Sequence, residues 1–153
     1  MAVIIKTPEE IRLLREGGHR LASILAKVAK KVAPGVTTKE LDEYAHTLIV
    51  EGGDEPAFLG YRPEGHGKAY PASLCTSVNN EIVHGIPKIG KVLKEGDIIS
   101  VDCGVKKNGF YGDHAYSFAV GKVKPELEKL LKVTKESLYK GVEQAVVGKQ
   151  IGR

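Results

Sequence analysis

Two aspartates, Asp102 and Asp113, interrupt a stretch that otherwise has the composition of two β-strands, SVDCGVKKNGFYGDHAYSF. Strand interiors disfavour Asp, and a carboxylate is seldom buried without a partner. Two hard oxygen donors held side by side suit a pair of divalent metal ions about 3.5–4 Å apart. On a solvated hairpin the same residues would contribute only solubility, so a metal site requires that the two carboxylates meet.

The turn between the two predicted strands decides how the aspartates are arranged. Asn108-Gly109 is typical of a two-residue hairpin turn. Such a turn pairs Gly104 with Asp113 and places Asp102 diagonally beside Asp113 on the same face. At about 6 Å and an effective dielectric of about 20, the two carboxylates would repel by about 3 kcal/mol. We therefore expect a shared proton, a basic side chain or cations to offset the repulsion. A three-residue loop would instead put the aspartates on opposite faces.

The other face of the hairpin is predicted to pack against a core. His114 is expected to contact Cys103 there as a packed pair rather than as a metal-binding pair, because the face is so apolar. The aspartate face carries small residues and should leave space above it. The residues expected on the core face are Ile99, Val101, Cys103, Val105, Gly112, His114, Tyr116 and Phe118.

Four further residues could contribute to a site, although each also has a simpler interpretation. His84 lies in a Gly/Pro turn, VHGIP, where a histidine is usually just exposed. Cys75 has the surroundings of a small core residue. Tyr61 and Tyr70 flank a loop rich in Gly and Pro, so they could form a pocket rim or pack on the loop itself. The sequence has no CxxC, HExxH, GxSxG or phosphate-loop motif.

The elements that would position these residues follow from capping signals and hydrophobic periodicity. A capping box formed by Thr7 and Glu10 predicts the start of the first helix, and Gly17-Gly18 within it indicate a close approach to the sheet. Helix, helix, antiparallel strands and helix form an α+β layout, with helices covering the Cys103 face of the sheet. Helices are expected over residues 8–33, 38–51 and 124–148, short strands over 55–61 and 72–78, and the hairpin over 99–118.

Composition places the chain among ordinary globular domains. Its 153 residues are 42% hydrophobic and 27% charged, which suits one soluble domain. Two cysteines give no disulfide framework and predict a reducing, cytoplasmic location. The sequence shows no signal peptide and no run of transmembrane length, so no membrane association is expected. The net charge of +4 is spread along the chain; it permits proximity to the ribosome but does not predict specific nucleic-acid binding.

Several segments, in order along the chain, resemble type I, bacterial-like methionine aminopeptidase. The resemblance covers essentially all 153 residues and includes the histidine turn, the spacing of the two hairpin aspartates and the pocket cysteine. The segments are TPEEI, PGVTTKELD, PAFLGY, YPASLCTSVNNEIVHGIP, LKEGDIISVDCGV, NGFYGDHAYSFAVG and TKESLY.

The resemblance implies roles for individual residues. Asp102 and Asp113 would bind two divalent metal ions, of Co, Mn, Fe, Zn or Ni. His84 would contact the substrate near the scissile amide and act in catalysis. The substrate would be the N-terminal methionine of nascent polypeptides, removed by metal-assisted hydrolysis. The methionine pocket would be lined by Tyr61, Tyr70, Cys75 and, where some relatives have a cysteine, Phe58.

The resemblance also implies a pita-bread fold with two pseudo-symmetric halves. Residues 1–153 would form a single domain equivalent to the N-terminal half, without the one His and two Glu ligands and the glutamate base of the second half. This chain alone is therefore expected to be inactive and prone to self-association. Two alternatives stay open: a non-catalytic half-domain that binds a peptide, a partner or a second copy of itself, and a relative of prolidase or aminopeptidase P.

Overall fold

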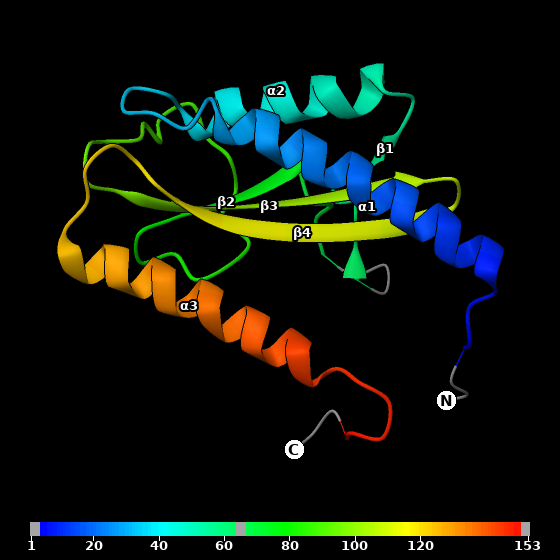
Figure 1. Ribbon diagram of the computed structural model, residues 1–153. Coiled ribbons are helices and arrows are strands. Elements are labelled where there is room, and N and C mark those ends of the chain that lie inside the picture. Colours follow the sequence, from blue (N-terminus) through cyan, green and yellow to red (C-terminus); the bar gives the residue numbers. More distant parts are fainter. Residues whose placement is uncertain (1–3, 64–66, 151–153) are drawn as a thin grey trace.

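One antiparallel sheet organises the protein, with strand β3 at its centre. The computed structural model describes residues 4–63 and 67–150. Strand β3 pairs with β1 and β2 along one edge and with β4 along the other. Helices α1 and α2 cover one face of this sheet, and α3 lies on the opposite side (Figure 1). The predicted α+β layout is confirmed. The elements are α1 (Pro8–Ala29), α2 (Thr38–Glu51), β1 (Glu55–Pro56), β2 (Leu74–Val78), β3 (Ile98–Lys107), β4 (Phe110–Ala119) and α3 (Pro125–Gln144).

The β3–β4 hairpin has the predicted turn and register. Asn108 and Gly109 both have positive φ, 51° and 81°, as the two central residues of a type I′ turn require. Gly104 pairs with Asp113, and Asp102 pairs with Ala115. The two aspartates therefore lie on one face as diagonal neighbours, as the turn chemistry predicts.

Capping and small residues explain how α1 meets the sheet. The predicted capping box is formed, with the Thr7 side chain accepting from the Glu10 amide and the Glu10 side chain accepting from the Thr7 amide. The helix continues through Gly17-Gly18 without a break. A Cβ built on Gly112 of β4 would lie 3.5 Å from Leu21 Cδ2 and 4.0 Å from the Gly17 carbonyl carbon. The predicted close approach is found at Gly17 only, as ordinary van der Waals contact, because a Cβ at Gly18 would meet no atom within 4 Å.

Four predicted boundaries differ from the structure by two residues or more, one of them the start of β2, which lies at Leu74 rather than at residue 72. The first helix ends at Ala29 and the third at Gln144, each about a turn earlier than predicted. The strand predicted over 55–61 is reduced to Glu55–Pro56. The chain turns immediately afterwards, with the Tyr61 amide donating to the Phe58 carbonyl at 3.0 Å, so these residues cannot continue the ladder.

The core lies between the sheet and the two helices above it. Apolar side chains at helical spacing on α1 and α2 pack on the side chains of β3 that point away from the aspartates. This burial is the main term that stabilises the fold. The most deeply buried members include Leu21, Ile24, Val28, Leu41, Ile49, Leu74, Ile99, Val101, Cys103 and Val105.

Phe118 of β4 packs against this core as predicted, but the prediction that His114 and Tyr116 also belong to it is wrong. Cys103 is fully buried, but its cross-strand neighbour His114 is exposed and Tyr116 is 38% exposed. The two therefore do not form a packed core pair. Strand β4 is the edge of the described sheet, and α1 covers it only in part. An open groove between them is lined by Ala22, Leu25, Ala26, Ala29, His114, Tyr116 and Phe118.

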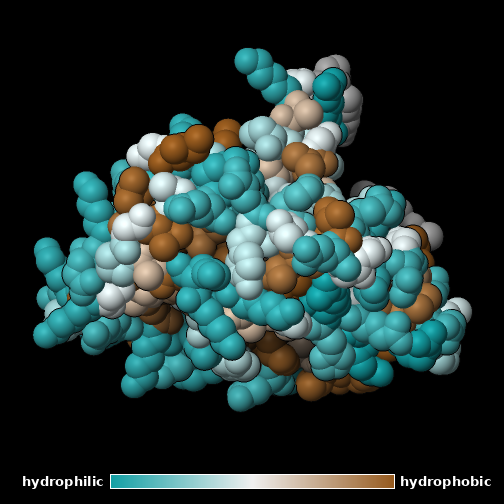
Figure 2. Space-filling view, turned by 90° about the horizontal axis from the view of Figure 1, so that it is seen from above, coloured by the Kyte–Doolittle hydropathy of each residue, from teal (hydrophilic) through white to brown (hydrophobic). Residues whose placement is uncertain are grey.

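The outer surface of the helical layer is mostly hydrophilic, with hydrophobic areas scattered over it (Figure 2). Helix α3 buries none of its residues. It reaches β4 through Lys135, whose Nζ donates to the Tyr116 hydroxyl at 3.0 Å and lies 5.3 Å from the centre of that ring. Within the described residues, no helix combines the length and apolarity needed to cross a membrane.

Candidate active site

A cavity of about 400 Å³ opens on the aspartate side of the sheet. Its walls come from the hairpin, from β2, from the histidine turn and from the segment between β1 and β2. The structure brings together every residue that the sequence singled out for the site. The lining residues are Phe58, Tyr61, Pro63, Lys68, Tyr70, Cys75, His84, Asp102 and Asp113.

The two aspartates share a strained electrostatic environment. Asp102 is half-buried, whereas Asp113 is exposed. Burial, and next the negative charge of Asp113, raise the pKa of Asp102 to about 6 from its ordinary value of 3.8. His84 opposes this rise. A cation between the carboxylates would remove the cost of ionising both, so the pair favours binding a positively charged ligand.

A constrained backbone holds His84 at the cavity. His84 has a φ of 58°, which is uncommon for a residue with a side chain. The adjacent Gly85 is fixed against β2, since its amide donates to Ser77 Oγ at 3.1 Å and its carbonyl accepts from the Thr76 amide at 2.7 Å. A Cβ at Gly85 would clash with the Thr76 carbonyl oxygen. Such backbone strain persists only where surrounding contacts impose it. Here the contacts of Gly85 with β2 impose it, and the exposed His84 lines the same cavity as the aspartates.

Aromatic side chains and a thiol form the opposite wall. The rings of Phe58 and Tyr70 meet edge to face, with centroids 6.5 Å apart. Phe58 lies over Gly104, where any Cβ would collide with its ring. Cys75 is only 5% exposed, and burial raises the pKa of its thiol, against the effect of a hydrogen bond with Tyr70. The wall is therefore uncharged at neutral pH and suits an apolar side chain.

Sequence reasoning missed two lining residues, Pro63 and Lys68. Both belong to the polar loop between Tyr61 and Tyr70, which has no periodicity from which an orientation can be predicted. The loop is closed at its base by Tyr61 and Tyr70, because the Tyr70 amide donates to the Tyr61 carbonyl at 2.9 Å. Lys68 adds a positive charge to a cavity that otherwise carries two carboxylates and an imidazole.

The donor set of the cavity fits divalent metals only in part. Two carboxylates suit hard divalent cations, and a bound cation would offset the repulsion between the two negative charges. Among residues 4–63 and 67–150, however, no three His, Cys, Asp or Glu side chains gather in a way that could hold a metal ion. Two metals that each need four to six ligands would find only part of their coordination here.

The fold and the site together consist of an antiparallel sheet, flanked by helices, that presents two neighbouring carboxylates to one cavity. A match to the model of metallopeptidase family M24 covers residues 12–153, and the chain belongs to that family. It is 47% identical over 149 residues to a methionine aminopeptidase of Clostridium acetobutylicum, covering 97% of this chain and 57% of that protein. The chain thus spans a little over half the length of the relatives it matches.

Solved structures agree with this assignment. The crystal structure of a methionine aminopeptidase from Thermotoga maritima superimposes with a TM-score of 0.86 at 37% identity, covering 95% of this chain and 55% of that one. An Xaa-Pro dipeptidase from Bacillus anthracis superimposes with a TM-score of 0.76 at 20% identity, over 93% of this chain and 36% of that one. The second likeness shows the shared pita-bread fold alone.

Proposed function

We propose that this chain carries the aspartate and methionine-pocket side of a methionine aminopeptidase active site. The observation that carries the proposal is that all seven residues singled out from the sequence line a single cavity. The identity of 47% to a methionine aminopeptidase over nearly the whole chain supports the same activity.

Asp102 and Asp113 are proposed to hold two divalent ions of Co, Mn, Fe, Zn or Ni. When bound, such ions lower the pKa of a water molecule and polarise a peptide carbonyl. The protein's part is to fix the carboxylates side by side on a rigid hairpin, so that little rearrangement is needed on binding. The raised pKa of Asp102 in the metal-free chain means that metal binding displaces a proton at mildly acidic pH.

His84 is proposed to act on the substrate rather than on a metal. Its imidazole can donate a hydrogen bond near the scissile amide, where negative charge develops during hydrolysis. The constrained φ of 58° and the contacts of Gly85 with β2 preorganise this donor. Preorganisation matters because a donor already in place costs no reorganisation when the charge develops.

The aromatic and thiol wall is proposed to take the methionine side chain. Thioethers make favourable contacts with aromatic rings, and Tyr61, Tyr70 and Phe58 supply three. Cys75 is expected to remain a neutral thiol, because burial raises its pKa. A charged first residue would lose its hydration against the aromatic and thiol wall, which offers it no charged partner, so this wall favours apolar N-terminal residues.

The proposed substrate is the N-terminal methionine of nascent polypeptides, which places the activity in the cytoplasm and near the ribosome. Both cysteines of the chain are free, as a reducing compartment allows. No specific nucleic acid is proposed as a partner. The exposed apolar residues of α3, among them Leu138 at 63% and Val142 at 60%, support the further proposal that the 153-residue chain self-associates.

The test needs a complete enzyme, meaning a chain that joins these 153 residues to a second half like that of the relatives. Release of methionine from a Met-Ala-Ser peptide should require added divalent metal. Asp113→Asn should abolish both turnover and stoichiometric metal. Cleavage of Xaa-Pro peptides in place of Met-Ala-Ser would favour a prolidase, and metal-free peptide binding without hydrolysis would favour a non-catalytic module.

A further inference from the structure

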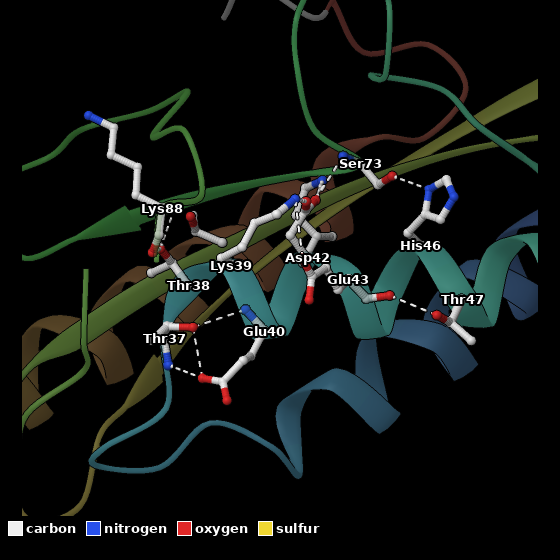
Figure 3. A network of polar contacts seen from close by, with 12 residues as sticks. Thr37, Thr38, Lys39, Glu40, Asp42, Glu43, His46, Thr47, Ser73 and Lys88 are labelled. Carbon is white, nitrogen blue, oxygen red and sulfur yellow. Dashed lines mark hydrogen bonds and ion pairs between the residues drawn. The ribbon is translucent and has the colours of Figure 1, made fainter. Parts of the chain in front are cut away.

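Two buried polar side chains of helix α2 bond the two segments that lead to His84 and to Cys75 in the candidate site. We propose that Thr38 and Asp42, one helical turn apart, are positioning residues: Thr38 sets the histidine turn and Asp42 sets the start of β2. The roles of His84 and Cys75 in this proposal rest on the proposed function, whereas the hydrogen bonds of Thr38 and Asp42 do not depend on it. Figure 3 shows Thr38 directed at Lys88 and Asp42 directed at Ser73.

Asp42 fixes the point at which β2 begins. Its side chain is 4% exposed, and Oδ1 accepts from the amides of Ser73 and Leu74 at 2.8 and 3.0 Å. Oδ2 pairs with Lys39 at 2.9 Å. The two amides directly precede Cys75, so the carboxylate determines how far this residue extends into the cavity. Hydrogen bonds to a charged acceptor are stronger than neutral ones, which makes the anchor stiff.

Thr38 holds the far end of the histidine turn. It is fully buried, and its hydroxyl accepts from the Lys88 amide at 2.9 Å and donates to the Lys88 carbonyl at 3.2 Å. The Thr38 amide also donates to the Lys91 carbonyl at 2.9 Å. Lys88 follows His84 closely along the chain, so these bonds limit the movement of the turn that presents the imidazole.

The two anchors are joined at the cavity itself. The Tyr70 hydroxyl lies 3.0 Å from the Leu74 carbonyl and 3.3 Å from the Gly85 carbonyl, and it donates to both. Leu74 is tied to Asp42, and Gly85 belongs to the turn that Thr38 anchors. Hydrogen bonds, together with the short backbone segment from Gly85 to Lys88, therefore connect α2 through β2 and Tyr70 to the histidine turn and back to α2.

Helix capping does not account for Thr38 or Asp42. The side chain of Thr37 caps α2, together with Glu40. Thr38 and Asp42 instead lie on the buried side of the helix, where apolar side chains would give stability without a desolvation cost. What their polar atoms add is a fixed position for the segments they bond. Both segments carry a residue proposed to contact substrate.

Kinetics on the complete enzyme separates positioning from general stability. Thr38→Val keeps the shape but removes the hydroxyl, and it should lower kcat at least tenfold with KM within about twofold, because it acts through His84. Thr38→Ser should restore most of kcat. Asp42→Leu should instead raise KM for Met-Ala-Ser at least tenfold, because it acts through the pocket wall, and Asp42→Asn should recover part of this loss. Turnover is expressed per metal-loaded active site, so that loss of folded protein does not imitate the effect.

Hydrogen exchange on the 153-residue chain gives a test that needs no activity. Thr38→Val should speed exchange of the Gly85 amide at least tenfold, while the Val101 amide in the central strand is unchanged. An unchanged exchange rate at Gly85, or equal acceleration at Gly85 and Val101, would overturn the proposal. In the kinetic test, Thr38→Val and Asp42→Leu lowering kcat equally without any change in KM would also overturn it. The predicted exchange pattern in a protein whose complete form releases no methionine would support the positioning role and refute the proposed function.

Discussion

Replacing Asp102 by Asn should stabilise the metal-free chain at neutral pH, although it removes a proposed metal ligand. The folded-state pKa of Asp102 is about 6, against an ordinary value of 3.8. Below about pH 4 the carboxyl is protonated in both states and costs nothing. As the pH rises from about 4 to about 6, the Asp102 carboxyl ionises more readily in the unfolded chain than in the folded chain, so the free energy of unfolding falls. Above pH 6 the penalty is constant.

The magnitude follows from the size of the pKa difference. Each pKa unit corresponds to about 1.4 kcal/mol, so the difference from 3.8 to about 6 corresponds to about 3 kcal/mol. Asp102 retains contact with solvent at the cavity mouth, and screening reduces the expected gain to about 1–2 kcal/mol. Asparagine cannot ionise, so Asp102→Asn should recover this free energy at pH 7.5 and little of it at pH 4.

Urea denaturation of the metal-free chain at pH 4 and pH 7.5 measures this directly. Glu143→Gln is a suitable control, because it removes one exposed carboxylate on α3 and should change stability by less than about 0.5 kcal/mol at either pH. Excess Mn²⁺ should stabilise the parent chain but not Asp102→Asn. If Asp102→Asn raised the free energy of unfolding equally at both pH values, or did not raise it at pH 7.5, ionisation of Asp102 beside Asp113 would not be what destabilises the parent chain.

Three further predictions concern the pocket, the histidine and the chain as it stands. In the complete enzyme, Cys75→Asp should weaken use of Met-starting peptides at least tenfold with metal retained, because an unpaired acid would face an apolar thioether; unchanged kinetics would remove Cys75 from the pocket. His84→Ala should lower kcat by about 10²–10³ with metal content unchanged, and loss of metal would make His84 a ligand instead. The 153-residue chain alone, with added Co²⁺ or Mn²⁺, should release no measurable methionine from Met-Ala-Ser, and turnover that vanishes in Asp113→Asn would contradict this.

Features that are determined by residues close together in the chain could be predicted from the sequence. The Asn108-Gly109 turn determines the pairing of Gly104 with Asp113, because a type I′ turn leaves only one register. The capping box of Thr7 and Glu10 determines the start of α1 in the same local way. Both depend on neighbouring residues alone, so no knowledge of the rest of the fold was needed.

Features that depend on distant partners could not be predicted in this way. The exposure of His114 results from how far α1 extends over the edge strand, which alternation along β4 cannot reveal. Thr38 bonds Lys88 across fifty positions of sequence, and Asp42 bonds Ser73 across thirty-one. The sequence shows only that Thr38 and Asp42 are polar residues on the apolar side of a helix, which does not identify the residues they bond. The assignment of His84, Cys75, Tyr61 and Tyr70 to a site came from family resemblance, since each residue alone also had a simpler interpretation.

Binding of Mn²⁺ to the 153-residue chain tests the central claim most directly, namely that Asp102 and Asp113 form a metal-binding pair. Electron paramagnetic resonance of free Mn²⁺ should detect weak binding, with a Kd of about 10⁻⁴–10⁻³ M, because two carboxylates supply few ligands. Asp113→Asn and Asp102→Asn should each abolish it, whereas Glu143→Gln should leave it unchanged. Equal Mn²⁺ binding by the parent chain and both aspartate variants would contradict the claim.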